Sequence, residues 1–388
     1  MRRGALTLVL LALVPASACG RGATDGVAST PPTVEAPEPE AHATETAEPA
    51  PSDEAPRRVE PRAAVFQRSR DMMGTIFQIT VLGEATPAGE AATDAALDEI
   101  GRLESVLSEW IPDSEMSQVN TNAGVHPVKV GADTLAVVRA GLEVSRWSGG
   151  AFDISWAALH GLYDFREGHH RAPTDAELAP KLKLIDWKRI ALDERKSTVF
   201  LKQKGMAIGT GGIGKGYSLD RAKAVLLERG FDNFMIFGGG QVTVQGKRGD
   251  RAWKVGIQHP RMNDYFAFLE ATEGSISTSG DYEHTFVDDQ GKRWHHIIDT
   301  HTGRPVDGTL SVTLLAPDGL HADALSTACF VLGPPKCLAM LAKVPGRPEA
   351  VIVDTNFQIH TTPGTEKRLT FTMSIEDGVL PHESPGTP

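Results

Sequence analysis

The most informative segment of the chain is Gly209-Thr-Gly-Gly-Ile-Gly-Lys-Gly-Tyr-Ser-Leu-Asp220, in which five glycines and one lysine precede a helix expected to begin near Asp220. Glycine lets the backbone approach a ligand closely, and the N–H groups at a helix N-terminus attract anionic oxygens. Lys215 would add a positive charge there. The spacing matches neither a Walker A loop nor a dinucleotide-binding fingerprint, and tight turns also use glycine. The segment alone therefore allows phosphate binding without establishing it.

Hydrophobic periodicity on both sides of this segment predicts a mixture of helices and strands. Residues 75–82 are rich in β-branched side chains and alternate, as is typical of a strand. The other expected strands are 234–237, 253–258, 311–315 and 350–353, and the expected helices are 88–106, 134–147, 220–228 and 322–332. Because strands and helices do not alternate regularly, we expect an α+β fold: a single compact domain of mixed sheets with flanking helices.

Two further segments carry polar groups suited to chemistry. In His295-His296-Ile-Ile-Asp299-Thr-His-Thr-Gly303-Arg-Pro305, a histidine near a tight turn is a candidate general base, and the alternative is a pair of exposed histidines on a structural turn. Asp323 and Thr327 lie four residues apart, so on a helix they share a face. A carboxylate and a hydroxyl suit Mg²⁺. The alternative is that Asp323 caps the helix.

The N-terminus predicts export. A basic pair is followed by the apolar run 5–14, which is too short for a membrane-spanning helix of about 20 residues and is typical of a signal peptide. Ala16-Ser-Ala-Cys19 resembles a lipobox, so we expect residues 1–18 to be removed and Cys19 to be lipidated. The alternative is an ordinary cleavage site after Ala18. A lipid anchor would tie the protein to a bacterial membrane, with its folded part on the periplasmic or other extracytoplasmic side.

Composition separates the folded part from its flanks. Residues 19–62 are rich in Ala, Pro, Glu and Thr and poor in large apolar side chains, so we expect a disordered linker, then a folded domain over 63–376 and a disordered tail over 377–388. The net charge of −11 argues against a general nucleic-acid binder. Cys329 lies in an apolar helical pattern, and we expect Cys329 and Cys337 to be free thiols, although an exported protein could pair them.

Seven motifs taken together resemble the ApbE family of FAD:protein FMN transferases, over about residues 70–355. Their order along the chain carries the resemblance, because each motif alone has an ordinary structural explanation. In chain order they are Met-Gly-Thr, Ser-x-Trp with Ser-Glu-x-Ser and Asn, Gly-Ala-Phe-Asp, Gly-Gly-Ile-Gly-Lys-Gly-Tyr, Thr-Ser-Gly-Asp-Tyr, His-Ile-Ile-Asp-x-x-Thr-Gly-x-Pro and Ala-Asp-Ala-Leu-Ser-Thr-Ala.

The resemblance implies a role for each matching residue. The Gly212 carbonyl, Asp323 and Thr327 would hold Mg²⁺, and His296 would remove the proton of an acceptor threonine. The residues expected to bind FAD are Met73, Trp110, Ala151, Phe152, Asp153, Lys215 and, through its backbone, Ile297. Trp110 could stack on a flat ring, the alternative being a core tryptophan.

The resemblance also implies a reaction and its partners. A threonine or serine hydroxyl of an acceptor protein would attack the FMN-side phosphorus of FAD, and AMP would leave. The acceptors would be exported or membrane redox proteins, such as subunits of sodium-pumping quinone reductases. Two other activities stay open: hydrolysis of FAD to FMN and AMP, and flavin binding by a periplasmic lipoprotein without turnover. A scaffold lipoprotein would leave the motifs unexplained.

The sequence departs from the family pattern at two positions. Gly209 stands where the family usually has Asp, so a carboxylate near the flavin or metal is missing from that position. Thr300 replaces a Pro after the Ile-Ile-Asp run, which relaxes the following turn. Because Lys215, His296 and Asp323 are retained, we expect an active enzyme.

Overall fold

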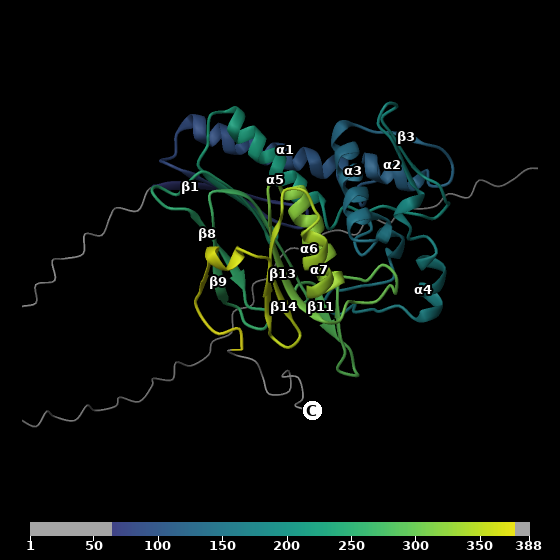
Figure 1. The fold of residues 1–388 in the computed structure, drawn as a ribbon. Coiled ribbons are helices and arrows are strands. Elements are labelled where there is room, and N and C mark those ends of the chain that lie inside the picture. The colour runs from purple at the N-terminus through teal and green to yellow at the C-terminus, as the bar shows by residue number, and fades with distance from the viewer. Residues whose placement is uncertain (1–63, 377–388) are drawn as a thin grey trace, which may run out of the picture. The chain divides into compact units, whose positions relative to one another are not determined.

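The computed structural model describes residues 64–376 (Figure 1). The expected signal peptide (1–18), the lipidation of Cys19, the linker 19–62 and the tail 377–388 lie outside the described residues and stay predictions. None of the helices in the described part is both long and apolar enough to span a membrane.

The centre of the fold is an eight-stranded antiparallel sheet with the order β1-β2-β6-β7-β10-β13-β14-β15. Strand β13 (Thr309–Ala316) lies well inside this sheet, and all eight of its residues are buried because both faces of the sheet are covered. The other strands are β1 (Val65–Met72), β2 (Thr75–Leu82), β6 (Phe234–Gly238), β7 (Gln241–Gln245), β10 (Glu273–Gly280), β14 (Glu349–Asp354) and β15 (Ile359–Thr361).

Helices cover one face of the sheet and a small sheet packs on the other. Helix α6 (Gly319–Leu332) packs on β10 and β13, and α5 (Gly214–Glu228) packs between α6 and α1 (Pro87–Leu107) (Figure 1). On the opposite face, β8 (Trp253–Gln258), β9 (Tyr265–Ala271) and β16 (Leu369–Phe371) form a three-stranded sheet whose apolar side chains pack with Val244 and Val353 of the central sheet.

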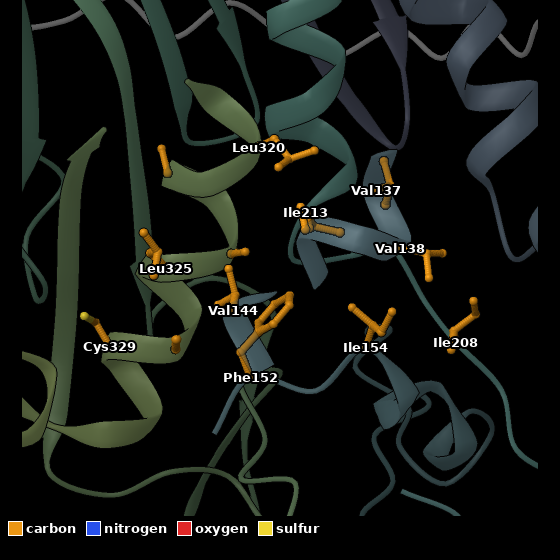
Figure 2. Packing of buried hydrophobic residues seen from close by; sticks show 14 of the residues in the cluster. Val137, Val138, Val144, Phe152, Ile154, Ile208, Ile213, Leu320, Leu325 and Cys329 are labelled. Carbon is orange, nitrogen blue, oxygen red and sulfur yellow. The ribbon is translucent and has the colours of Figure 1, made fainter. Parts of the chain in front are cut away.

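A second group of elements packs beside α1 and α6. Helix α3 (Ala132–Trp147) contacts both of these helices, and Figure 2 shows its Val138 and Val144 near Phe152, Ile154 and Ile213 in one apolar core. The remaining elements are α2 (Glu115–Thr121), β3 (Val128–Lys129), α4 (Asp175–Leu182), β4 (Ile190–Asp193), β5 (Thr198–Leu201), β11 (Thr285–Val287), β12 (Arg293–His295), α7 (Pro334–Leu341) and the 3₁₀ turns η1 (Ile154–Leu159), η2 (Trp187–Arg189) and η3 (Thr365–Arg368).

The predicted α+β fold is confirmed, but one local expectation and one of the alternatives are wrong. Helix α5 begins at Gly214, inside the glycine-rich segment, and not near Asp220. Helix α6 is capped by Asp318, whose side chain accepts a hydrogen bond from the N–H of His321, so Asp323 is not its N-cap.

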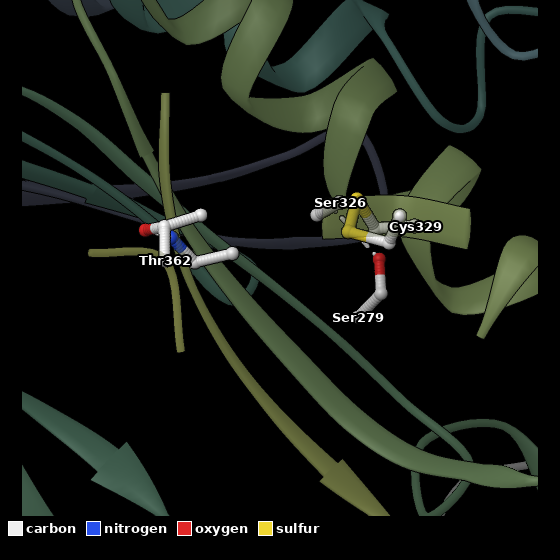
Figure 3. Close-up of a disulfide and its surroundings, with 6 residues drawn as sticks. Ser279, Ser326, Cys329 and Thr362 are labelled. Carbon is white, nitrogen blue, oxygen red and sulfur yellow. Dashed lines mark hydrogen bonds between the residues drawn. A yellow bond between two sulfur atoms is a disulfide. The ribbon is translucent and has the colours of Figure 1, made fainter. Parts of the chain in front are cut away.

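The expectation of two free thiols is also wrong, because Cys329 and Cys337 form a disulfide (Figure 3). Gly333, with φ of 71°, ends α6, and α7 begins at the next residue, Pro334. This reversal returns the chain and places the two Cα atoms 4.6 Å apart. The disulfide therefore fixes the C-terminal end of α6, next to Ser326, to α7 (Figure 3).

Two glycines allow α5 and α6 to cross in direct backbone contact. A Cβ on Gly216 would lie 2.0 Å from the carbonyl oxygen of Gly319, and a Cβ on Gly319 would lie 2.4 Å from that of Gly216. Helix interiors normally disfavour glycine. The close crossing explains why the helix nevertheless begins among glycines.

We expect Gly216→Ala to lower the free energy of unfolding by about 2 to 3 kcal/mol, because the added methyl group forces the two helices apart. Gly101→Ala on α1 is the matched control, since its Cβ would meet only Met72 Sδ at 3.7 Å. Thermal unfolding of both variants measures the difference. Equal melting temperatures for the two variants would contradict the tight crossing.

Candidate active site

The helix crossing brings two of the predicted segments together. Asp323 Oδ2 accepts a hydrogen bond of 3.0 Å from the Gly216 N–H. Gly212 lies against Thr327, because a Cβ on this glycine would be 3.3 Å from Thr327 Oγ1. Lys215 donates to the Gly211 carbonyl at 3.2 Å. The four residues predicted for the metal and the pyrophosphate therefore lie where the start of α5 meets α6.

These groups offer oxygen ligands in a buried position. Asp323 is only 4% exposed, and burial raises the pKa of its carboxyl while the positive charge of Lys215 lowers it. Ser279 on β10 is hydrogen bonded to Ser326 at 2.9 Å and lies 3.5 Å from the Thr327 hydroxyl. Residues 64–376 contain no group of three or more His, Cys, Asp or Glu side chains placed to hold a metal. One carboxylate, a hydroxyl and a carbonyl fit a hard cation that takes its other ligands from water or phosphate.

A cavity of about 510 Å³ opens at the turn between β1 and β2. At Gly239, in the turn between β6 and β7, a Cβ would lie 2.9 Å from Thr75 Cγ2 and 3.3 Å from Lys215 Cδ. The Lys215 side chain therefore passes close to Thr75, which lines the cavity. Its lining residues are Asp71, Met72, Met73, Gly74, Thr75, Ile76 and Glu104.

Met73 shapes this cavity through an unusual backbone. Met73 and Gly74 form the two-residue turn between β1 and β2, with φ of 49° and 72°, as in a type I′ turn. Positive φ is costly for a residue other than glycine and is often found at functional sites. The Met73 N–H donates to Glu104 Oε1 at 2.7 Å, which stabilises the turn.

Trp110 lies at the surface and is 71% exposed, so the alternative of a core tryptophan is wrong. Its ring stacks on His160 with centroids 4.5 Å apart, which leaves one ring face for a planar ligand.

Three of the residues expected to bind FAD are buried: Ala151, Phe152 and Asp153. Phe152 belongs to the core in Figure 2, and a Cβ on Gly212 would lie 3.2 Å from its ring. The Asp153 carboxylate accepts hydrogen bonds from the N–H and hydroxyl of Ser155 and from the Trp187 N–H, at 2.8, 2.6 and 2.9 Å. Its oxygens therefore already have partners within the protein.

His296 and His295 differ in environment, as adjacent residues in an extended segment do. His296 is exposed to solvent, and its ring lies edge-on to that of His284 with centroids 5.4 Å apart. Part of the His296 side chain reaches solvent, but many protein atoms surround the ring, and this desolvation, followed by the nearby His284, His295 and Lys215, lowers the pKa of His296. The imidazole is therefore neutral at neutral pH and can accept a proton.

His295 is buried, and both of its ring nitrogens have partners. Its Nε2 donates to the Val306 carbonyl at 3.0 Å, and its Nδ1 accepts from the Ile297 N–H at 3.3 Å. The Ile297 carbonyl accepts from the Val306 N–H at 3.2 Å. Both backbone groups of Ile297 thus already bond within the protein. Thr300, the second departure from the family pattern, donates its hydroxyl to the Gly150 carbonyl at 2.8 Å.

Sequence reasoning missed two buried carboxylates at this site. Asp220 accepts the N–H groups of Gly319 and Leu320 at 2.6 and 2.9 Å, and burial raises its pKa to about 7. It fixes the N-terminus of α6 to α5. Glu109 lies beside Gly209, and its Oε1 would be 3.0 Å from a Cβ at that position. Neither carboxylate has a local sequence signal, since each acts across a contact between distant segments.

The chain is similar to known proteins over nearly all of its described part. The model of the ApbE family matches residues 73–352. An FAD:protein FMN transferase of Klebsiella pneumoniae is 33% identical over 71% of this chain and 85% of its own length, and one of Treponema pallidum is 32% identical over 79% and 90%. The crystal structure of the ApbE protein of Thermotoga maritima, 30% identical, superimposes with a TM-score of 0.72 over 79% of this chain and 99% of its own. The chain belongs to the ApbE family.

Proposed function

We propose that the protein transfers FMN from FAD to a threonine or serine hydroxyl of an acceptor protein and releases AMP, with Mg²⁺ as the metal. The observation that carries the proposal is the meeting of Lys215, Gly212, Asp323 and Thr327 at the crossing of α5 and α6. The names of the relatives, FAD:protein FMN transferases, support the same reaction.

The binding groups suit a pyrophosphate. Lys215 would place its ammonium against the phosphate oxygens, next to the cavity beside Met73. The Gly212 carbonyl, Asp323 and Thr327 would hold Mg²⁺, which when bound offsets negative charge on the pyrophosphate and orients it. Trp110 presents a free ring face for one of the two ring systems of FAD.

His296 supplies the base. The acceptor hydroxyl forms a bond to the FMN-side phosphorus while the bond from that phosphorus to the AMP oxygen breaks. The hydroxyl proton passes to His296, whose lowered pKa keeps the ring unprotonated at neutral pH. AMP leaves with the electron pair of the broken bond, and the product is a phosphoester of FMN on the acceptor.

We also propose that the enzyme is exported and lipid-anchored at Cys19, with acceptors among exported or membrane redox proteins. The support is the sequence of residues 1–19, a basic pair and a short apolar run ahead of the lipobox-like Ala16-Ser-Ala-Cys19.

One observation favours a second activity. Because His296 is open to solvent, a water molecule could take the place of the acceptor hydroxyl and release free FMN. Incubation of the protein with FAD and Mg²⁺, with and without an acceptor domain, separates the two. AMP that appears only with acceptor supports transfer. AMP and FMN formed equally fast without acceptor would demote the protein to an FAD pyrophosphatase, and intact FAD would leave only a flavin-binding role.

A further inference from the structure

Glu109 contacts the glycine-rich segment although it lies far from it in sequence. Its side chain is only 6% exposed. Glu109 Oε2 accepts hydrogen bonds from the Thr210 N–H at 3.3 Å and from the Thr210 hydroxyl at 3.1 Å, and the hydroxyl can turn instead to the Leu107 carbonyl, also at 3.1 Å. A buried carboxylate thus fixes the second residue of the segment.

Thr210 in turn fixes the residues expected to bind the pyrophosphate. Its carbonyl accepts from the N–H groups of Ile213 and Gly214 at 3.0 and 2.7 Å, which closes the turn that leads into α5. Gly212 lies within this turn and Lys215 directly after it. The direction of the Gly212 carbonyl and of the Lys215 side chain therefore depends on how Thr210 is held.

The surroundings leave room for the Glu109 carboxylate only because residue 209 has no side chain. A Cβ at Gly209 would lie 3.0 Å from Glu109 Oε1, 3.1 Å from Ala157 Cβ and 3.2 Å from Trp156 Cζ2. Gly209 does not require a positive φ, so the restriction comes from space and not from the backbone.

His160 closes the cluster on its other side. Its Nε2 lies 3.8 Å from Glu109 Oε1, and this buried nitrogen has no hydrogen-bond partner among residues 64–376. Trp110 stacks on the same ring. The Glu109 carboxylate thus lies between the glycine-rich segment and the His160 ring on which Trp110 stacks.

We propose that Glu109 is a positioning residue that holds the glycine-rich segment in the conformation that binds FAD. It acts through Thr210 and makes no contact with the reacting atoms. The inference rests on the proposed function, because it assigns the segment to the pyrophosphate of FAD.

The first test compares FAD affinity in Glu109→Ala and Glu109→Gln by calorimetric titration with Mg²⁺ and without acceptor. Loss of a charged hydrogen-bond acceptor is expected to raise the Kd of Glu109→Ala roughly 10- to 100-fold. Glu109→Gln keeps the shape and one acceptor oxygen, so its Kd should rise less. Thermal unfolding of each variant confirms that it folds. Wild-type affinity in the folded Glu109→Gln and Glu109→Ala variants would overturn the proposal.

The second test places a carboxylate at residue 209, opposite the position of the Glu109 carboxylate. Gly209→Asp alone is expected to weaken FAD binding, because it places a second carboxylate against Glu109. In Glu109→Ala the opposing carboxylate is gone, although Ala157 and Trp156 still border residue 209, so Gly209→Asp in that background should recover part of the lost affinity. Gly209→Asn in the same background fills the same space without the charge, so it should recover less affinity than Gly209→Asp. An equal loss of FAD affinity from Gly209→Asp in both backgrounds, in variants that keep the melting temperature of their parents, would overturn the proposal.

The same titrations separate this proposal from the proposed function. If the wild-type protein binds FAD and the Glu109 variants bind it equally well, the proposed role of Glu109 is rejected and the proposed function is not. If the wild-type protein does not bind FAD, both the proposed role of Glu109 and the proposed function are rejected. Binding alone distinguishes these two outcomes, so neither depends on a transfer assay.

Discussion

Replacing His296 by alanine is expected to lower the rate of FMN transfer by about 10²- to 10⁴-fold, which is the usual contribution of a well-placed general base. Part of the His296 side chain reaches solvent, and desolvation together with the nearby His284, His295 and Lys215 lowers its pKa, so the wild-type ring is unprotonated at neutral pH. FAD affinity should stay close to the wild-type value, because His296 is assigned to the acceptor hydroxyl. Single-turnover transfer and FAD titration measure the two quantities.

His301 provides the matched control for this prediction. It lies in the same segment, its side chain is 66% exposed, and its Nδ1 lies 3.2 Å from Asp299 Oδ1. We expect His301→Ala to transfer FMN at nearly the wild-type rate. A His296→Ala enzyme as fast as the His301→Ala enzyme would show that another group removes the proton.

Replacing Asp323 by asparagine is expected to lower transfer by about 10²- to 10³-fold, since a metal centre contributes several kcal/mol to stabilising the transition state. The loss should shrink as the Mg²⁺ concentration is raised. Stability should not fall, because asparagine removes a buried carboxyl whose pKa is raised by burial yet keeps an acceptor for the Gly216 N–H. Activity against Mg²⁺ concentration, together with thermal unfolding, tests both parts.

Asp318→Asn is the control on the same helix. Asp318 caps α6 through the His321 N–H, and asparagine is an equally good N-cap, so little change in activity is expected. If Asp323→Asn keeps both the wild-type rate and the wild-type Mg²⁺ dependence, Asp323 does not hold the metal.

Elements with a clear local pattern could be predicted from the sequence. The strand expected at 75–82 is β2 (Thr75–Leu82), and the one expected at 253–258 is β8 (Trp253–Gln258). The start of α5 could not be predicted, because glycine has low helix propensity and only the contact between Gly216 and Gly319 explains it. Packing between distant segments, and not local helix propensity, therefore determines where α5 begins.

The candidate site shows the same division. Lys215, His296 and Asp323 stand in ordered motifs, so their roles could be predicted from resemblance, and those roles stay predictions. The Cys329–Cys337 disulfide and the contact of Glu109 with Thr210 could not be predicted, because each depends on how distant or reversed segments meet. Asp153 was expected at FAD, yet its carboxylate bonds Ser155 and Trp187.

The measurement that tests the central claim most directly is the intact mass of a candidate acceptor domain after incubation with the protein, FAD and Mg²⁺, with flavin fluorescence recorded on a denaturing gel. The account predicts an acceptor heavier by one FMN less water, one AMP released per adduct, and loss of both signals with His296→Ala or a chelator. Unmodified acceptor beside free FMN and AMP, or beside intact FAD, would contradict it.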